Sequence, residues 1–307
     1  MTAKVAVLLR EYEDLREVTE NIPWCKKSWW DSYSFKFSDW ILLDAWFRSR
    51  CLEIPNRGET MIPCIDMVNH SSVANSYYEP TADGVALLLR PDVKLDIGEE
   101  ITISYGNAKS EAEMLFSYGF IDRGSSAKGL TLNLEPNPED PLGKAKAAAF
   151  AKPLVVQIVE EQGNPHWESP FIYFMCLNED DGLDFRVLQQ TDGSRGQLKV
   201  FWQGLDVTDS TDKFEFHVRD HELRDVFKLR AVVLLQSRVR QQLERLLESD
   251  DMVKSLAETT FVASSSQGNA LQLRQSETLV LEKLFSGLDM QVRKFRLTPQ
   301  SYKLTLS

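Results

Sequence analysis

Two short stretches decide the fold: Ile65-Asp66-Met67-Val68-Asn69-His70-Ser71 and Ile101-Thr102-Ile103-Ser104-Tyr105-Gly106. The first is an apolar run that ends in three polar residues, which could not all be buried without hydrogen-bonding partners. The second is a β-branched strand that ends in a tyrosine and a glycine. A predicted strand at 84–90 and a turn at 95–100 separate them, and the first half of the chain is organised around the pair.

This order of motifs resembles the C-terminal half of a SET-domain methyltransferase. In that family the asparagine-histidine stretch and the tyrosine strand come together to hold S-adenosyl-L-methionine and the amine that it methylates. Either stretch alone would be a weak signal. Both stretches in this order, joined by a strand and a Gly-Glu-Glu turn and followed by Tyr118-Gly119-Phe120, form a specific one.

The composition is that of a globular protein with one large or two medium domains, since 307 residues contain 43% hydrophobic and 26% charged side chains. The formal net charge is −11, from 46 acidic against 35 basic residues. This excess argues against broad nucleic-acid contact, which needs a basic face. A negative surface suits a basic polypeptide partner such as a lysine-rich segment, although acidic soluble proteins are also common.

The cysteine pattern and the hydropathy favour an intracellular protein. Four cysteines are scattered without metal-type pairing: Cys25, Cys51, Cys64 and Cys176. No apolar stretch approaches the roughly 20 residues that span a membrane. The first 20 residues are too charged for a signal peptide. We therefore expect a cytoplasmic or nuclear protein without membrane contact.

Three features are predicted before the first motif. Residues 5–20 are predicted to form a helix bounded by Pro23, because a proline pushes the residue before it out of helical geometry. Six aromatic residues crowd residues 24–37; they could form a substrate cage, but a hydrophobic clamp between elements is favoured. Ser38 is predicted to cap a helix over 39–51, whose apolar residues surround much of its circumference and predict deep packing.

A capping box, Ser110-Glu111-Ala112-Glu113, predicts a helix that runs to about Tyr118, with Gly119 as its left-handed cap. Beyond this helix the composition shifts to small and polar residues, with several prolines. We place a domain boundary there. The expected fold class is α+β, with a β-rich SET core at 1–134 and a mainly α-helical domain at 135–307.

Helices are predicted in the second half over 144–161, 220–249 and 269–285. Pro153 is expected to kink the first of them. Residues 180–212 are charged and contain Gly and Ser, which favours an exposed loop region with at most a short strand at 198–204.

Several other classes of site are missing from the sequence. It has no dinucleotide-binding glycine fingerprint, no phosphate-binding loop and no Gly-x-Ser-x-Gly elbow. His217 and His221 are one helical turn apart, a spacing that could bind a metal, but no third ligand is evident. We predict no metal site, and we expect His166 on the surface or in a loop.

The chain is similar, more narrowly, to the Rubisco large-subunit methyltransferase class, which includes ribosomal-protein, histone and actin-histidine methyltransferases. Arg48-Ser49-Arg50 ends an aromatic helix upstream of the asparagine-histidine stretch. No cysteine-rich zinc segment follows the SET core. Leu273-Arg274-Gln275-Ser276-Glu277 lies in the helical C-terminal part. The match is strong over about 39–120 and looser beyond it.

The resemblance implies that Asn69 and His70 hold the adenine and amino-acid ends of the cofactor. It implies that Tyr105 is the catalytic tyrosine and Tyr118 a second aromatic side chain on the cofactor side. Taken singly, these residues also allow simpler interpretations. The asparagine and histidine could cap a buried turn, and Tyr105 could be a core tyrosine at a strand end.

Three further positions follow from the same resemblance. Ser49 and Arg50 would line the channel for cofactor and lysine, and Asp66 would sit beside them. Arg50 could instead be a surface-paired helix terminus. One feature of the family has no counterpart: nothing in residues 1–58 can act as the glycine-rich strand whose backbone contacts the methionine end of the cofactor. We therefore expect either a truncated chain or an incomplete cofactor pocket.

The chemistry of lysine methylation fits a buried tyrosine. A lysine amine has an ordinary pKa near 10.4, so presenting it uncharged at pH 7 costs about 4.6 kcal/mol. An enzyme offsets this cost by excluding water and by aligning the amine with the methyl group. A tyrosine hydroxyl can orient the amine without a charge of its own to desolvate.

The expected function is therefore that of an S-adenosyl-L-methionine-dependent protein-lysine N-methyltransferase. Its expected partner is a protein substrate with a basic, lysine-containing segment, without direct nucleic-acid contact, and the enzyme is expected to be a monomer. Two alternatives stay open. One is a non-catalytic SET-like module, truncated or a pseudoenzyme, that binds a protein through its helical domain. The other is a protein-histidine methyltransferase.

Overall fold

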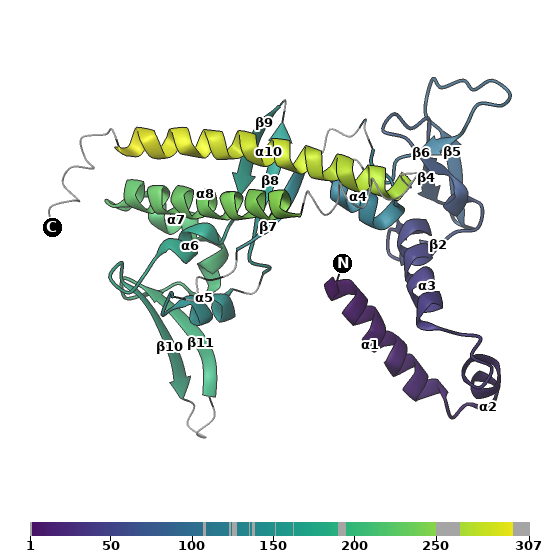
Figure 1. Cartoon of the computed structure of the whole chain (residues 1–307), viewed down its shortest axis with the longest axis horizontal. Coiled ribbons are helices and arrows are strands. Elements are labelled where there is room, and N and C mark those ends of the chain that lie inside the picture. Colours follow the sequence, from purple (N-terminus) through teal and green to yellow (C-terminus); the bar gives the residue numbers. More distant parts are fainter. Residues whose placement is uncertain are drawn as a thin grey trace. The chain divides into compact units, whose positions relative to one another are not determined.

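The computed structural model describes residues 2–106, 109–122, 124, 128–134, 136, 139–150, 152–161, 163–189, 195–249 and 265–296. The chain divides into two units, Met1–Ser125 and Ser126–Ser307, which are traced from purple to yellow in Figure 1. The α+β class predicted from the sequence is confirmed, with small sheets in both units and long helices in the second. None of the described helices has the length and the apolar content that would let it cross a membrane.

The N-terminal unit begins with helices. Their bounds are α1 Thr2–Thr19, α2 Pro23–Cys25, η1 Lys26–Trp30 and α3 Phe37–Arg50. The ring of Tyr12 on α1 lies 5.7–5.8 Å from the rings of Trp30, Phe35 and Phe37. Its hydroxyl donates to the carbonyl of Phe35. This part of the aromatic segment is thus a hydrophobic clamp that holds α1, as favoured by the sequence.

Two predictions for α3 are wrong. The helix begins one residue before Ser38, and its first turn is closed by Asp39, whose carboxylate accepts from the Lys36 backbone N–H at 2.7 Å. The helix is also not deeply packed. Four of its apolar side chains remain between 44% and 48% exposed: Leu42, Leu43, Trp46 and Phe47. The helix carries apolar residues around much of its circumference, but α1 and the other elements that contact it leave none of these residues fully buried.

The strands of this unit form three pairs. Their bounds are β1 Cys51–Ile54, β2 Gly58–Met61, β3 Asn69–His70, β4 Ser76–Pro80, β5 Val85–Leu89 and β6 Thr102–Ile103. The pairs β1–β2 and β4–β5 are antiparallel, whereas β3 and β6 are parallel. In the parallel pair Asn69 lies opposite Thr102 and His70 opposite Ile103. This pairing joins the two stretches that decide the fold.

Helix α4 (Glu111–Tyr118) has the predicted ends. The Ser110 hydroxyl accepts from the backbone N–H of Glu113, and the Glu113 carboxylate accepts from the backbone N–H of Ser110 at 2.7 Å. Gly119 ends the helix with φ 82°, in the left-handed region that favours glycine. The capping box and the glycine together fix the two ends of the helix, and with them the positions of Tyr118 in its last turn and of Phe120 just beyond it.

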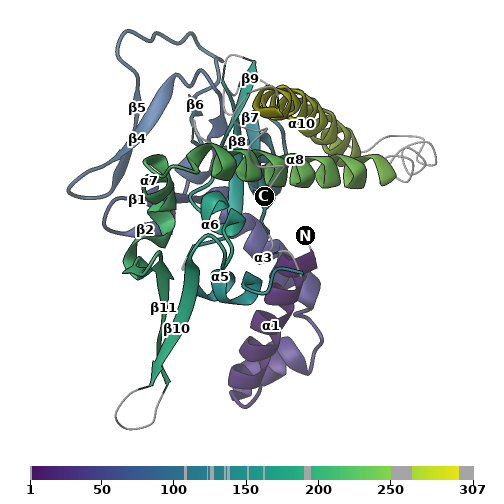
Figure 2. The ribbon, with the colours of Figure 1, turned by 90° about the vertical axis from the view of Figure 1, so that its left-hand side faces the viewer.

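The core of the C-terminal unit lies between a sheet and two long helices. The antiparallel sheet contains β7 (Lys128–Asn133), β8 (Val155–Glu161) and β9 (Asn164–Glu168). The helices α8 (Arg224–Glu248) and α10 (Ser265–Arg296) run side by side next to it in Figures 1 and 2. Buried residues from β7, β8, α8 and α10 meet in this core, including Leu132, Val156, Ile158, Leu235, Val239, Leu281 and Leu288, and the partly buried Trp167 of β9 packs against them. Arg274 on α10 donates to the carbonyl of Leu246 in the last turn of α8.

The predicted helix over 144–161 is wrong in its second half. Helix α5 covers only Gly143–Ala149, and β8 follows. The helix ends at Ala149, and Phe150 is already extended. Pro153 prevents the helix from resuming, because proline lacks an N–H group and disfavours helical geometry in the residue before it. The strand β7, which the predicted boundary assigns to the first domain, pairs with β8 with Gly129 opposite Val159. It therefore belongs to the C-terminal unit.

Residues 180–212 are not an exposed loop region where the structure describes them. They form β10 (Leu183–Gln189), β11 (Arg195–Trp202), β12 (Leu205–Asp206) and most of η3 (Thr208–Lys213). One face of this sheet packs on α6 (Ile172–Cys176), α7 (Phe214–Arg219) and α8. The second core contains, among others, Phe171, Phe174, Leu183, Val200, Trp202, Phe214 and Phe227. Alternating apolar residues, such as Leu183 and Phe185 or Leu198 and Val200, supply the buried face.

We expect the ion pairs of Asp44 to stabilise the packing of α1 on α3. Its carboxylate lies 2.9 Å from Lys4 Nζ and 2.8 Å from Arg48 Nε. Burial raises the pKa of Asp44, but hydrogen bonds and charge from Lys4 and Arg48 more than reverse this, so the pKa lies below its ordinary value. Asp44→Asn should lower the free energy of unfolding by about 1 kcal/mol at pH 7, as measured by chemical denaturation.

The sign of this shift sets the pH dependence. Because the folded-state pKa is lowered, the stabilisation is present above the ordinary carboxyl pKa and is lost as the pH falls through the folded-state value. The difference between wild type and Asp44→Asn should therefore vanish in acid. Asp184→Asn, at a half-exposed pair with Arg186, is the matched control and should change stability by less than about 0.5 kcal/mol. Equal stability of Asp44→Asn and wild type at pH 7 would contradict the prediction.

The left-handed cap of α4 gives a second prediction. Gly119→Ala should lower the free energy of unfolding by about 1 kcal/mol, because φ 82° is costly for any residue with a Cβ. Gly268→Ala is the control, since Gly268 lies inside α10 with open space around it. That substitution should raise stability by about 0.5–1 kcal/mol. The midpoint temperature of thermal unfolding should fall in Gly119→Ala and rise in Gly268→Ala. A shift of both midpoints in the same direction would contradict the left-handed cap at Gly119.

Candidate functional site

The parallel pair β3–β6 brings the catalytic tyrosine of the sequence prediction next to the asparagine-histidine stretch. The backbone N–H of Ser71 donates to the carbonyl of Ile103 at 3.0 Å. Just beyond, the backbone N–H of Tyr105 donates to His70 Nδ1 at 3.1 Å, and the Tyr105 hydroxyl donates to the carbonyl of Val68 at 2.7 Å. Tyr105 is thus held at both its backbone and its side chain by the first stretch.

Aromatic rings surround Tyr105. Its ring lies 4.6 Å from that of Tyr118 and 5.2 Å from the imidazole of His70, and Phe120 contacts all three rings. Burial and the neighbouring Tyr118 raise the pKa of Tyr105, although Arg50 works in the opposite direction. Burial also raises the pKa of Tyr118. Both phenols therefore keep their protons at neutral pH.

A cavity of about 550 Å³ opens beside these rings, and we call it the tyrosine cavity. Five residues implied by the resemblance line it together: Ser49, Arg50, Asp66, Tyr105 and Tyr118. They come from the end of α3, from η2 (Ile65–Met67), from the residues after β6 and from the end of α4. Residues that are distant in sequence thus meet around one space of the size that holds small ligands.

Basic side chains fix one part of the cavity wall. Arg50 lies 3.4 Å from the Asp66 carboxylate and also contacts the sulfur of Met67. Lys109 donates to the carbonyl of Tyr105 at 2.8 Å, and its ammonium lies 5.9 Å from the centre of the Tyr118 ring. Each of these basic groups therefore supports a residue of the cavity.

An acidic pair forms another part of the wall. Glu53 on β1 and Glu59 on β2 lie directly opposite each other in the hairpin, and both line the cavity. Their charges affect the pKa values of neighbouring residues. The pKa of Cys51 is raised by burial in the first place, and further by the charges of Glu59 and Asp66. Burial, Tyr118 and Glu53 likewise raise the pKa of Tyr78. Two like charges opposite each other cost stability, and here they border a cavity.

The structure separates two of the predicted cofactor residues from the others. Among the described residues that line the tyrosine cavity, neither Asn69 nor His70 occurs. Asn69 instead donates to the carboxylate of Glu100 at 2.6 Å. The His70 side chain is only 5% exposed and contacts Asp122 at 3.0 Å. Both side chains thus bond residues next to the parallel strand pair, and their predicted contacts with a cofactor stay predictions.

Sequence reasoning missed several residues of the cavity and its support: Cys51, Glu53, Glu59, Tyr78, Lys109 and Asp122. No motif contains them. The hairpin β1–β2 follows the predicted helix directly, so its two glutamates could have been noticed as cross-strand partners. The others depend on tertiary contacts alone.

The two other histidines with metal-like spacing are occupied by hydrogen bonds. His217 Nε2 lies 2.8 Å from the Ser210 hydroxyl, and His221 Nε2 lies 2.6 Å from the side-chain amide of Gln203. Within the described part of the chain, no three His, Cys, Asp or Glu side chains gather as metal ligands would. His166 lies in the strand β9 and not in a loop.

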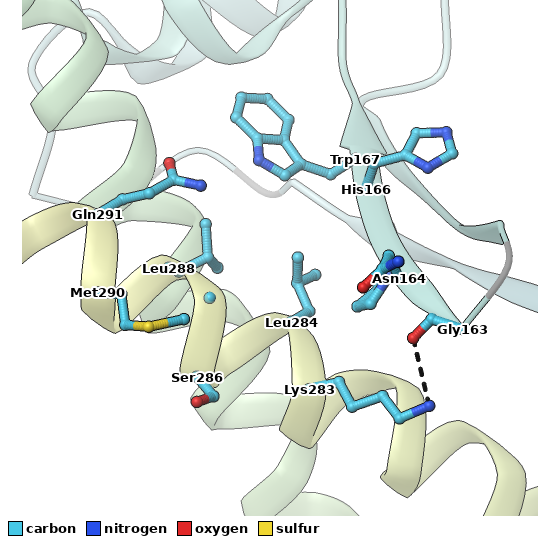
Figure 3. Close-up of a pocket in the computed structure, with 12 residues that line it drawn as sticks. Gly163, Asn164, His166, Trp167, Lys283, Leu284, Ser286, Leu288, Met290 and Gln291 are labelled. Atoms are coloured by element: carbon cyan, nitrogen blue, oxygen red, sulfur yellow. Dashed lines mark hydrogen bonds between the residues drawn. The ribbon is translucent and has the colours of Figure 1, made fainter.

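A larger cavity, of about 630 Å³, lies in the C-terminal unit between β9 and α10 (Figure 3). Figure 3 shows Trp167, Leu284 and Leu288 on its walls, and Lys283 donates to the carbonyl of Gly163. Lys283 also pairs with Glu160 at 2.7 Å. Although this cavity is larger than the tyrosine cavity, the lysine on its wall is already paired. Size alone therefore does not identify the functional site. The convergent polar groups are those of the tyrosine cavity.

No family model matches the chain. SET domain-containing protein 8 of Schizosaccharomyces pombe is 30% identical over 271 residues, which cover 83% of this chain and 59% of that protein. The chloroplastic Rubisco large subunit N-methyltransferase of Pisum sativum is 28% identical over 168 residues, covering 48% of this chain and 34% of that protein. The chloroplastic fructose-bisphosphate aldolase-lysine N-methyltransferase of Arabidopsis thaliana is 30% identical over 142 residues, covering 41% and 30%.

Solved structures of Rubisco large-subunit methyltransferase (LSMT) have the same fold. The crystal structure of the SET domain of LSMT bound to lysine and AdoHcy superposes with a TM-score of 0.63 at 17% identity, covering 99% of this chain and 67% of that one. The structure of Rubisco LSMT bound to AdoMet has a TM-score of 0.56 at 16% identity, covering 97% and 68%. At this identity the likeness concerns the fold.

The chain spans less than two thirds of the curated relatives that it matches, from 59% of the S. pombe protein to 30% of the A. thaliana enzyme. Within that span, the sequence likeness covers 83% of this chain and the structural likeness nearly all of it. The motifs, the parallel strand pair and these likenesses agree: the chain resembles SET-domain proteins of the Rubisco large-subunit methyltransferase-like class in sequence and has the fold of the solved LSMT structures.

Proposed function

We propose that the chain is an S-adenosyl-L-methionine-dependent protein-lysine N-methyltransferase that acts on a protein substrate. The observation that carries the proposal is the position of Tyr105. Its partly buried phenol lines the tyrosine cavity and donates to the Val68 carbonyl, and its backbone N–H donates to His70. The names of two plant relatives, a Rubisco large subunit N-methyltransferase and an aldolase-lysine N-methyltransferase, support it.

The residues of the cavity fit the cofactor. Tyr78, Tyr105 and Tyr118 offer aromatic faces, which attract a cationic sulfonium. Ser49 and Arg50 offer donors to an amino-acid carboxylate. S-adenosyl-L-methionine, when bound, supplies an electrophilic methyl group on a positively charged sulfur. Two of the solved structures with the same fold are described as bound to AdoMet or AdoHcy.

The Tyr105 hydroxyl can orient the lysine amine without accepting or giving up a proton. Its hydrogen points to the Val68 carbonyl, so the lone pairs of its oxygen are free to accept an N–H of the substrate. Because burial raises the pKa of Tyr105, the group stays neutral. Partial burial disfavours the charged ammonium, and an uncharged acceptor stabilises that charge less than a carboxylate would. The site therefore gives access to the neutral amine, which the transfer requires.

The acidic pair supports a basic, lysine-containing segment as substrate. Glu53 and Glu59 lie opposite each other on β1 and β2 beside the cavity, and both are exposed. No ion pair between either of them and a described lysine or arginine is present. A cationic segment that binds there would relieve their repulsion, and it would also suit the net charge of −11.

We expect Tyr105→Phe to lower kcat for methylation of a lysine peptide by about 100-fold, because the amine loses the acceptor that orients it. The affinity for S-adenosylhomocysteine in calorimetric titration should change little, and the free energy of unfolding should fall by only about 1 kcal/mol. Tyr173→Phe, at a partly buried tyrosine of the C-terminal unit, is the matched control.

The same measurements decide between the proposal and the alternatives. Unchanged kcat in Tyr105→Phe would remove the mechanistic core of the proposal. A folded wild type that binds a protein partner but no S-adenosylhomocysteine would identify a non-catalytic SET-like module. Transfer to histidine and not to lysine in peptides that contain both would identify the histidine methyltransferase.

We expect Glu59→Gln to separate stability from substrate binding. Removing one of two opposed charges should raise the free energy of unfolding by a few tenths of a kcal/mol. It should also raise KM for a basic lysine peptide several-fold and make KM less sensitive to salt. Glu79→Gln is the control, because Glu79 lies opposite Ala86 on another hairpin. An equal effect of both substitutions on KM would argue against binding of the basic substrate segment by the acidic pair Glu53 and Glu59.

A further inference from the structure

The side chain of Asp122 is held by several hydrogen bonds, and the proposed mechanism gives it no role. Its carboxylate accepts from His70 Nε2 at 3.0 Å, from the Ser72 hydroxyl at 2.7 Å and from the backbone N–H of Gly124 at 2.9 Å. Its side chain is only 13% exposed. Burial raises the pKa of Asp122, but these hydrogen bonds more than reverse this, so it is a carboxylate at neutral pH. Among the described residues it does not line the tyrosine cavity.

The hydrogen bonds of His70 determine its tautomer. A backbone N–H can only donate, so the bond from Tyr105 N to His70 Nδ1 requires that Nδ1 carries no proton. The proton of the neutral imidazole must then be on Nε2, which faces Asp122. A carboxylate that accepts there favours this tautomer over the other, as carboxylates do when they orient functional histidines.

The arrangement around Asp122 is built for close approach. A Cβ at position 124 would overlap the Ser72 hydroxyl where it now lies, so glycine at this position lets the Gly124 N–H and the Ser72 hydroxyl both donate to Asp122. Ser72 adds a second donor from the residues that follow β3. Asp122 therefore connects the end of β3 with the chain beyond Phe120, and through His70 it reaches the backbone of Tyr105.

We propose that Asp122 is a positioning residue for the site: it holds His70 in the Nε2-protonated form, so that Nδ1 anchors the backbone of Tyr105 beside the cavity. This role rests on the proposed function, in which Tyr105 orients the amine. The anchoring acts on the position of the Tyr105 hydroxyl, whereas cofactor binding is shared with several other residues of the wall, among them Ser49, Arg50 and Tyr118. Loss of the anchor should therefore lower kcat and leave cofactor affinity almost unchanged.

The first test is the tautomer of His70 in the 307-residue chain. The chain has four histidines, so long-range proton–nitrogen NMR correlations can be assigned to His70 by their loss in His70→Gln. Wild type should show Nε2–H and an unprotonated Nδ1. Asp122→Asn should lose this signature, because an amide cannot accept from both His70 and Gly124 as the carboxylate does. Ser72→Ala, the matched control, should keep it.

The second test is kinetic. Asp122→Asn should lower kcat about 10- to 100-fold, with KM and the affinity for S-adenosylhomocysteine within about twofold of wild type. Asp184→Asn, at the half-exposed ion pair with Arg186, is the kinetic control and should keep the activity of wild type. A merely structural role of Asp122 would instead lower kcat, cofactor affinity and the free energy of unfolding together, and that result would overturn the proposal.

The two tests separate this proposal from the proposed function. A wild-type His70 protonated on Nδ1, or an Asp122→Asn variant that keeps Nε2–H, overturns the positioning role whatever the activity. A wild type with the expected tautomer but without methyl transfer refutes the proposed function and with it the catalytic purpose of the anchor. The spectrum of the wild type alone can refute the proposal, so the proposal remains testable even if Asp122→Asn fails to fold.

Discussion

The short parallel pair of β3 and β6 is the constraint from which the candidate site follows. It places His70 beside Ile103, two residues before Tyr105. Only two residues of each strand pair, so the ladder by itself is weak, and side chains reinforce it. Asn75 accepts from the backbone N–H of Thr102 at 2.8 Å, and His70 accepts from that of Tyr105. Polar side chains with backbone partners thus replace the hydrogen bonds that a longer sheet would provide.

The tyrosine cavity combines neutral and charged groups with different tasks. Tyr105 is kept neutral by burial, and an uncharged acceptor stabilises an ammonium less than a carboxylate would. The charges stand at the wall, where Arg50 faces Asp66 and the acidic pair Glu53 and Glu59 is exposed. Exposed like charges on a hairpin cost only a few tenths of a kcal/mol, whereas buried ones would cost several. The hairpin can therefore keep an acidic rim at little cost in stability.

The sequence predicted local structure best where a few neighbouring residues set it. The capping box at Ser110 and the left-handed Gly119 are confirmed because their hydrogen bonds and dihedral angles are local. It failed where packing decided. The expected deep burial of α3 is wrong because an apolar pattern does not state how many sides find partners. The helix predicted through Pro153 is wrong because the β-branched run after it pairs with β7 and becomes a strand.

The sequence by itself indicated the resemblance to SET-domain methyltransferases, since the two motifs, their order and their spacing can be read directly from it. It also indicated Tyr105 and its neighbours as candidates. Only the tertiary structure decided which of them share a cavity: Ser49, Arg50, Asp66, Tyr105 and Tyr118 do, whereas Asn69 and His70 bond residues next to the parallel strand pair. Asp122 lies 52 residues from its partner His70. The physical reason is that hydrogen bonds and burial depend on distance in space, which the order of residues along the chain does not specify.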